Sequence, residues 1–136
     1  MKAQKKQPKR IEAVAALLVR GPRVLALRRP PSGLLGGLWE LPGGELAAGE
    51  RPAAGLARAL RERVGLAPLR AQRLGEVTHG FTHRTLRLHV YRAAASAGRV
   101  RRSDADAHRW LPLAALEALP LSAVAKKALA LAAARD

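Results

Sequence analysis

Apolar and polar positions follow two different periods along the chain, and these periods predict which segments form strands and which form helices. An apolar run over residues 13–19 leads into Gly21 and Pro22, and a second apolar run follows over residues 24–27. Short apolar runs separated by a Gly-Pro pair are typical of two strands joined by a tight turn. We therefore expect a hairpin at the start of the folded chain.

The clearest helical pattern lies over residues 52–64, where apolar side chains recur at spacings of three and four. Pro52 stands at the start of this segment and Gly65 directly follows it, and these residue types favour helix boundaries. The pattern predicts a helix from Pro52 to Val64 that packs Leu56 and Leu60 inward.

Short strands are expected on both sides of this helix. Residues 29–38 are rich in Pro and Gly and indicate an ordered loop, and residues 39–46 indicate two short strands with a break between them. Residues 72–79 and 85–91 predict strands that flank the turn-like segment 80–83. In the segment 85–91, Leu86, Leu88 and Val90 alternate with Arg87, His89 and Tyr91, which is typical of a strand with one buried face.

Two helical patterns, over residues 113–119 and 123–133, follow a polar loop, and Pro120 separates them. The order of hairpin, helix, strands and helices predicts an α/β (α+β) domain, in which a mixed sheet is sandwiched between helices. A chain of 136 residues is long enough for one such domain.

Positive charge is the main compositional feature. The chain has 25 Lys and Arg against 10 Asp and Glu, a formal net charge of +15. Residues 1–10 carry five of these charges with little apolar content, so we expect a basic disordered arm at 1–10 and the folded domain at 11–136. Such a charge balance is typical of a protein that binds a polyanion, although a coding bias towards Arg and Ala would produce it as well.

Two absences narrow the class of protein. The sequence has no cysteine, which excludes disulfides, thiolate metal sites and cysteine nucleophiles. The apolar run at residues 13–19 is too short to span a bilayer and lacks a signal peptide's cleavage pattern. We expect a cytoplasmic protein that does not enter a membrane.

A spaced motif crosses the predicted helix. Gly44 is followed after five residues by Glu50, and after seven more by a charged helix that ends in Gly and an aliphatic residue. This spacing resembles the Nudix box. In the Nudix family, the positions of Ala59, Glu62 and Arg63 here hold carboxylates that bind a divalent metal and a diphosphate on one helical face.

The resemblance implies a metal set of Gly44, Glu50 and Glu62, with Mg²⁺ or Mn²⁺ as the cofactor if the protein is hydrolytic and Glu62 as the candidate catalytic residue. Ala59 and Arg63 depart from the family pattern, which leaves one of three helical carboxylates. One carboxylate supplies too few oxygen ligands for a hard divalent cation. The sequence leaves open whether a carboxylate elsewhere supplies the missing ligand, and the candidates are Glu76, Asp104 and Asp106.

Structural roles compete with metal binding at each of these residues. Glu62 is placed to form an ion pair with Arg58 one turn earlier. Glu50, near the start of the helix, is placed to order the preceding loop or to interact with the helix dipole. Arg63 is expected to pair with Glu62 or with a phosphate.

A narrower resemblance covers three further segments. Residues 28–42 resemble the Arg-Arg-Pro and Gly-Leu-Trp-Glu-x-Pro signature of the C-terminal domain of MutY-type adenine glycosylases, and residues 79–83 resemble that family's His-x-Phe-Ser-His element. Residues 109–111, which lead into the two C-terminal helical patterns, resemble a third element of that family. That domain reads 8-oxoguanine in DNA, so the resemblance implies that Phe81, Thr82 and His83 contact the base. Arg29, Arg58 and Arg63 are the candidate contacts to nucleic acid.

Alternatives remain for these residues and for the whole chain. Phe81 could instead be a core aromatic at the end of a hairpin. Helical-domain and iron-sulfur segments of a glycosylase are missing from this sequence, so we expect that the chain does not excise adenine by itself and that a separate glycosylase domain is a candidate partner. The chain is expected to recognise 8-oxoguanine in DNA or in an oxidised purine nucleotide. The alternative functions are an 8-oxo-dGTP diphosphatase and a general nucleic-acid binder.

Overall fold

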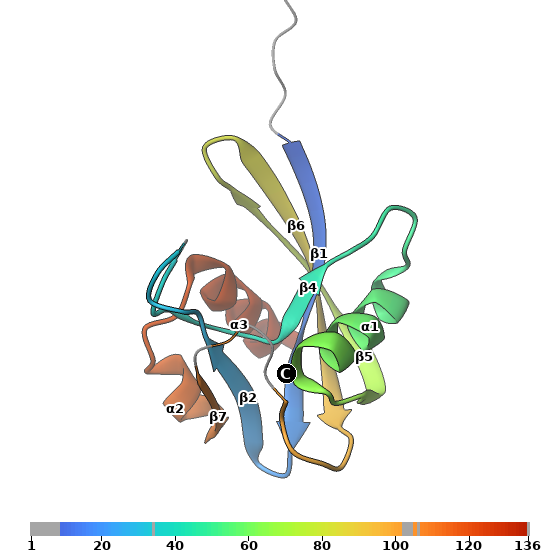
Figure 1. The fold of residues 1–136 in the computed structure, drawn as a ribbon, viewed down its shortest axis with the longest axis vertical. Helices are drawn as coiled ribbons and strands as arrows, with labels where there is room; N and C mark the ends of the chain where they lie inside the picture. The colour runs from blue at the N-terminus through green and yellow to red at the C-terminus, as the bar shows by residue number, and fades with distance from the viewer. Residues whose placement is uncertain (1–8, 34, 102–104, 106, 136) are drawn as a thin grey trace, which may run out of the picture.

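The computed structural model describes residues 9–33, 35–101, 105 and 107–135, and these form a seven-stranded mixed sheet with three helices (Figure 1). The strands are β1 (Lys9–Arg20), β2 (Arg23–Arg28), β3 (Trp39–Glu40), β4 (Gly43–Glu45), β5 (Pro68–Gly80), β6 (Arg84–Ala95) and β7 (Ala107–Pro112). The helices are α1 (Pro52–Val64), α2 (Leu113–Glu117) and α3 (Ala123–Arg135).

Strand β1 is the central element of the sheet. It pairs in parallel with β6 from Lys9 to Val19, and antiparallel with β2 and β4. The order β3-β2-β1-β6-β5 is completed by β4 on β1 and β7 on β2. Lys9 and Arg10 therefore belong to the sheet and not to a disordered arm, because β6 provides their backbone partners. The other residues of the expected arm, 1–8, lie outside the described residues.

Helices cover both faces of the sheet, and β1 contributes to two separate cores. Its odd positions, such as Ala13 and Leu17, pack with α3, whereas its even positions, such as Val14 and Leu18, pack with α1. This division follows from the two-residue period of a strand. The mixed sheet between helices is thus confirmed.

Helix α1 has the bounds that the sequence predicts, and Leu56 and Leu60 are fully buried. It ends at Gly65, whose φ of 71° is left-handed and suits glycine. Two expectations were wrong. Strand β6 is buried on both faces from Leu88 to Tyr91, because α1 covers the side that Tyr91 occupies. Residues 107–112 form β7, which was not expected.

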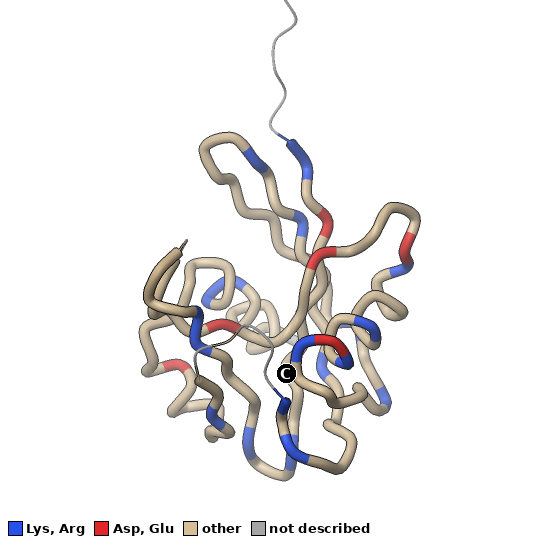
Figure 2. Tube along the Cα trace, in the orientation of Figure 1, with Lys and Arg blue, Asp and Glu red and all other residues tan. Residues whose placement is uncertain are grey.

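One end of the sheet extends beyond the helices. The upper parts of β1, β5 and β6 project as a three-stranded ribbon, with the turn between β5 and β6 at its tip (Figure 1). Lys and Arg lie along this ribbon and are also spread through the rest of the molecule (Figure 2). None of the described helices is long enough and apolar enough to cross a bilayer.

Candidate functional site

A cavity of about 370 Å³ lies between the sheet and α3. Its apolar wall comes from the odd positions of β1, the even positions of β6 and the first turns of α3, including Ile11, Leu86, Leu88, Val124 and Ala128. Charged side chains line the same cavity, namely Arg29, Glu40, Glu45, Arg63 and Arg84. An apolar cavity with a few polar groups is the usual form of a small-molecule site.

Of the three expected base contacts, only Phe81 lines this cavity. Its ring meets the ring of His79 edge to face, with 4.8 Å between centroids, and the Arg84 guanidinium lies 5.7 Å from its centroid. Thr82 and His83 are exposed at the tip of the ribbon, where the His83 carbonyl accepts a hydrogen bond from the backbone of Lys9. The loop therefore presents Phe81 inward and its other two side chains outward.

A second cavity of about 250 Å³ adjoins the first, and both are lined by Arg29, Glu40 and Arg63. Glu40 accepts from Arg29 at 3.1 Å and lies 3.4 Å from an Arg63 nitrogen. Arg63 also donates to the Gly43 carbonyl at 2.9 Å. In these contacts the helix directs Arg63 towards β3 and β4 and not towards the expected partner Glu62.

Arg58 joins the two carboxylates that remain in the box. It donates to Glu50 at 2.7 and 3.0 Å and to Glu62 at 2.8 Å, and it also reaches the Glu45 carbonyl. The ion pair between Arg58 and Glu62 is confirmed. Glu50 also accepts from the backbone N–H of Ala47 at 2.9 Å, so it orders the loop before α1.

These bonds change the acidity of Glu50. The hydrogen bond from Arg58, followed by that from Ala47, lowers the pKa of Glu50 from 4.5 to about 2. The same contact with Glu50 raises the pKa of Arg58 above its ordinary value. Both groups are therefore charged over the whole physiological range.

The arrangement does not fit the divalent cation that the resemblance implies. Glu50 and Glu62 are both engaged by Arg58, and the Arg63 guanidinium holds the carbonyl beside Gly44. Ala59 is 2% exposed and packs against Gly44, where a family carboxylate is missing. Within the part of the chain that is described, no group of three His, Asp or Glu side chains is placed to hold a metal ion.

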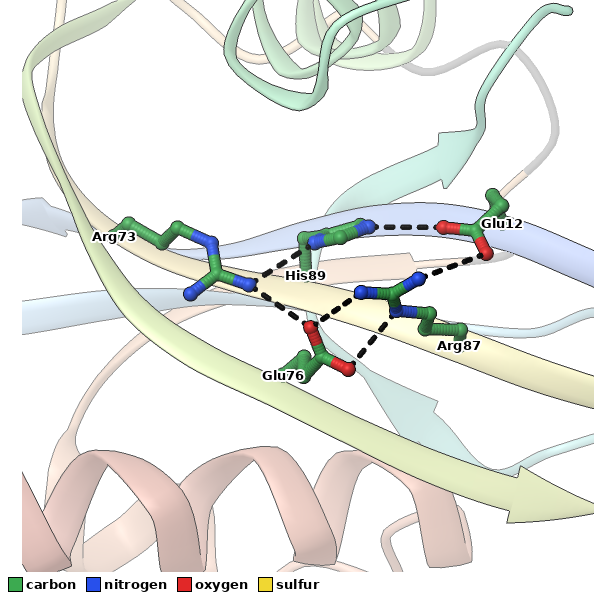
Figure 3. A network of polar contacts seen from close by, with 5 residues as sticks. All are labelled: Glu12, Arg73, Glu76, Arg87 and His89. Atoms are coloured by element: carbon green, nitrogen blue, oxygen red, sulfur yellow. Dashed lines mark hydrogen bonds and ion pairs between the residues drawn. The ribbon is translucent and has the colours of Figure 1, made fainter.

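Glu76, considered as a substitute ligand, belongs to another network (Figure 3). It accepts two hydrogen bonds from Arg87, at 2.9 and 3.0 Å, and Arg87 lowers its pKa. Buried His89 lies between Glu12 at 3.0 Å and Arg73 at 3.3 Å. A carboxylate only accepts and a guanidinium only donates, so His89 carries its proton on Nε2. Asp104 and Asp106 lie outside the described residues.

Two site residues were not assigned from the sequence. Glu40 lies within the segment 28–42 that resembles the MutY signature, but its position between two guanidinium groups depends on α1 bringing Arg63 to β3. Ser122 lines the first cavity and is 3% exposed. Its hydroxyl accepts from the backbone N–H of Ala125 at 3.1 Å. A Ser before a helical pattern is a known start signal and could have identified it.

The low pKa of Glu50 leads to a prediction about acid stability. Its folded pKa lies below its ordinary value, so its contribution to stability is complete above pH 4.5 and is lost as the pH falls towards 2. We expect Glu50→Gln to lower the melting temperature at neutral pH and to lose that effect progressively in acid. Thermal melts against pH test this, with exposed Glu117→Gln as the control. A constant difference between the parent chain and Glu50→Gln from neutral pH to pH 2 would contradict it.

Comparisons with known proteins agree with this geometry. The family model described as NUDIX domain matches residues 13–131. A putative 8-oxo-dGTP diphosphatase 2 of Mycobacterium tuberculosis is 43% identical over 108 residues, which cover 76% of this chain and 74% of that protein. The adenine DNA glycosylase of Mus musculus is 41% identical over 93 residues, or 67% of this chain but only 18% of the glycosylase.

A solved structure shows the same fold. The crystal structure of a MutT NUDIX hydrolase from Burkholderia pseudomallei superimposes with a TM-score of 0.80 at 28% identity, covering 89% of this chain and 96% of that one. The relatives thus include proteins named as hydrolases, among them the putative 8-oxo-dGTP diphosphatase, and proteins named as DNA glycosylases. The family match over residues 13–131, together with the mixed sheet and the box helix, shows that this chain belongs to the NUDIX family.

Proposed function

We propose that this chain recognises 8-oxoguanine, in a purine nucleotide or in DNA, and hydrolyses nucleoside triphosphates weakly or not at all. One observation carries the proposal. Both remaining box carboxylates, Glu50 and Glu62, are bound by Arg58, while Arg63 occupies a position where the family places a carboxylate. Because a guanidinium group already engages these carboxylate oxygens, few oxygen ligands remain for a divalent cation.

The first cavity supports a purine as the ligand. Its volume of about 370 Å³ suits a nucleobase with part of its sugar, and its apolar wall offers Phe81 and aliphatic side chains to a flat ring. The Ser122 hydroxyl uses its oxygen to accept from Ala125, which leaves its proton for a base edge. Glu40 and Arg29, which line the same cavity, add an acceptor and a donor.

The exposed loop supports contact with DNA. Thr82 and His83 stand at the tip of a projecting ribbon whose strands begin with Lys9, Arg10 and Arg84. Cationic side chains of this kind neutralise phosphates, while a hydroxyl and an imidazole offer directional bonds to a base. A separate glycosylase domain is the partner that the MutY resemblance implies for this arrangement.

Hydrolysis of oxidised nucleotides is the second candidate function. The observation in its favour is the 43% identity with a putative 8-oxo-dGTP diphosphatase over 74% of that protein's length. Turnover of 8-oxo-dGTP with Mg²⁺ or Mn²⁺ separates the two functions, because recognition alone releases no pyrophosphate.

Lesion preference should depend on Thr82. 8-Oxoguanine carries a protonated N7 that guanine lacks, and this N–H can donate to the Thr82 hydroxyl. One such bond contributes about 0.5 to 1.5 kcal/mol, so we expect the chain to bind a lesion duplex about two- to tenfold more tightly than an undamaged one. Titration of both duplexes with Thr82→Val should show that preference lost, whereas exposed Thr78→Val on β5 serves as the control. An undiminished preference in Thr82→Val would mean that the Thr82 hydroxyl does not recognise the lesion.

The salt dependence of binding separates contacts with DNA phosphates from recognition of the base. Because basic side chains displace counterions from phosphates, affinity for any duplex should fall at least about tenfold between roughly 50 and 200 mM salt. Deleting residues 1–8 removes three lysines and leaves β1 intact, so it should flatten the salt slope equally for damaged and undamaged DNA. A slope that is unchanged by the deletion would exclude the arm from the interface.

A further inference from the structure

The projecting ribbon has two faces that differ in their chemistry. Residues that are directly paired across β5 and β6 point to the same face, and neighbours along a strand point to opposite faces. Val77 pairs with Leu88, and Leu88 lines the first cavity. Thr78 pairs with Arg87 and therefore lies on the other side. We call the first side the cavity face and the second the ladder face.

Positive charges on the ladder face are paired with carboxylates (Figure 3). Arg87 donates to Glu76 at 2.9 and 3.0 Å and lies 3.7 Å from Glu12. Arg73 lies 3.2 Å from Glu76. A phosphate would have to displace a carboxylate to reach either guanidinium group, and it would be repelled by the charge of that carboxylate. The ladder face is therefore a poor surface for a polyanion.

Two cations beside the first cavity have neutral partners instead. Arg84 lines the cavity, and its guanidinium lies 5.7 Å from the ring centroid of Phe81. Lys127 is exposed on α3 and donates to the Thr78 carbonyl at 3.0 Å. Within the described residues, no carboxylate forms an ion pair with either side chain. Both cations therefore keep their charge for an anion.

Arg84 and Lys127 border the cavity from two different elements. The ribbon contributes Phe81 and Arg84 to its lining, and α3 contributes Ala128, the neighbour of Lys127. A free nucleotide carries its phosphates on one side of its sugar, whereas a nucleotide within a strand has a phosphate on both sides. Cations from two elements around one cavity for a base therefore suit a strand. An unpaired strand delivers a base at the lowest cost, because the base need not leave a duplex.

We propose that an unpaired strand of DNA crosses the cavity face from the ribbon to α3, with a purine base in the first cavity and the phosphates on either side of it against Arg84 and Lys127. This inference rests on the proposed function, which places an oxidised purine base in that cavity. It adds that the ligand is a nucleotide within a strand and not a free nucleotide, and that the ladder face makes no contact with DNA.

Fluorescence anisotropy with two probes tests the proposal, using a labelled single-stranded oligonucleotide with one central 8-oxoguanine and 8-oxo-dGMP as its competitor. We expect the oligonucleotide to bind at least about tenfold more tightly than 8-oxo-dGMP at low salt, because only the strand reaches both cations. Arg84→Gln and Lys127→Gln should each weaken oligonucleotide binding about three- to tenfold. Each should also lower the salt slope by about 0.7, the value for one phosphate of a single strand.

Two control variants change the same unit of charge elsewhere. Thr78→Glu adds one negative charge to the ladder face, at an exposed position of the same ribbon. Arg23→Gln removes one positive charge at the other end of β1, roughly 35 Å from Arg84 along a strand of 12 residues. That distance exceeds the screening length of about 10 Å. Each control should alter the affinity for the oligonucleotide by less than about twofold.

The outcomes distinguish this inference from the proposed function. If 8-oxo-dGMP binds as tightly as the oligonucleotide, or if Thr78→Glu weakens oligonucleotide binding as much as Arg84→Gln and Lys127→Gln do, the strand path is overturned while recognition of the purine stands. If neither probe is preferred to its counterpart with undamaged guanine, the proposed function is overturned. If the oligonucleotide still binds in that case and both Arg84→Gln and Lys127→Gln weaken it, the strand path stands by itself.

Discussion

Release of pyrophosphate from 8-oxo-dGTP should be at least about a hundredfold slower with this chain than with its Ala59→Glu, Arg63→Glu double variant in the presence of Mn²⁺. The side chain of residue 59 lies against Gly44, so a glutamate there would extend beside the box backbone. Replacing Arg63 removes a positive charge and releases the Gly43 carbonyl. The double variant thereby gains two carboxylates next to Glu62, which is the charge that a divalent cation requires.

Controls make this comparison specific. Arg61→Glu reverses one exposed charge on the same helix without adding a ligand to the site, so it should not gain activity. Adding Glu62→Gln to the double variant should abolish the gain. Robust turnover by the unmodified chain, abolished by Glu62→Gln alone, would show that the hydrolase reading is correct and that the pairing with Arg58 does not prevent catalysis.

Replacing Gly43 with Ala should lower the free energy of unfolding by about 3 kcal/mol or more, whereas Gly44→Ala should have a much smaller effect. A Cβ atom at Gly43 would lie 2.0 Å from the carbonyl oxygen of Val14. That oxygen belongs to the backbone of β1, which is paired with β4, so it cannot swing aside as a flexible side chain would. The strands can relieve such a contact only by giving up the pairing of β4 with β1. At Gly44 the nearest atom is the Ala59 Cβ at 3.3 Å, and a small shift accommodates it.

Chemical denaturation of the two variants, measured by circular dichroism, gives both free energies directly. The expected loss for Gly43→Ala corresponds to a fall in melting temperature of roughly 10 °C for a domain of this size. The comparison is matched, since both variants add one methyl group to neighbouring residues of β4. Equal destabilisation by the two substitutions would mean that the tight approach of β4 to β1 does not constrain position 43.

Local signals in the sequence predict much of the secondary structure. Helix α1 has the predicted bounds because Pro52, its apolar spacing and Gly65 all act within one segment. The edges of the sheet were harder to predict. Residues 107–112 carry no strong period of their own, and they form β7 because β2 offers an unpaired edge. Strand pairing of this kind depends on a distant segment, which no local pattern reveals.

The candidate site divides in the same way. The box spacing, the missing carboxylates and the ion pair of Arg58 with Glu62 could be predicted, because all of them lie in α1 or in the short segment directly before it. The contacts of Arg63 with Gly43 and Glu40 span 20 and 23 residues of sequence, and they could not be predicted. Nor could the sequence separate Phe81, which faces the cavity, from Thr82 and His83, which face solvent.

The sequence by itself determined the family, the box helix and the loss of metal-binding charge, because residue type and local spacing are sufficient for each of these. Only the tertiary structure decided that Arg29, Glu40 and Arg63 form one wall between two cavities. These three residues come from the loop after β2, from β3 and from α1. They meet because the two faces of the sheet must both be buried, and that burial brings the end of α1 against the loop and the short strands.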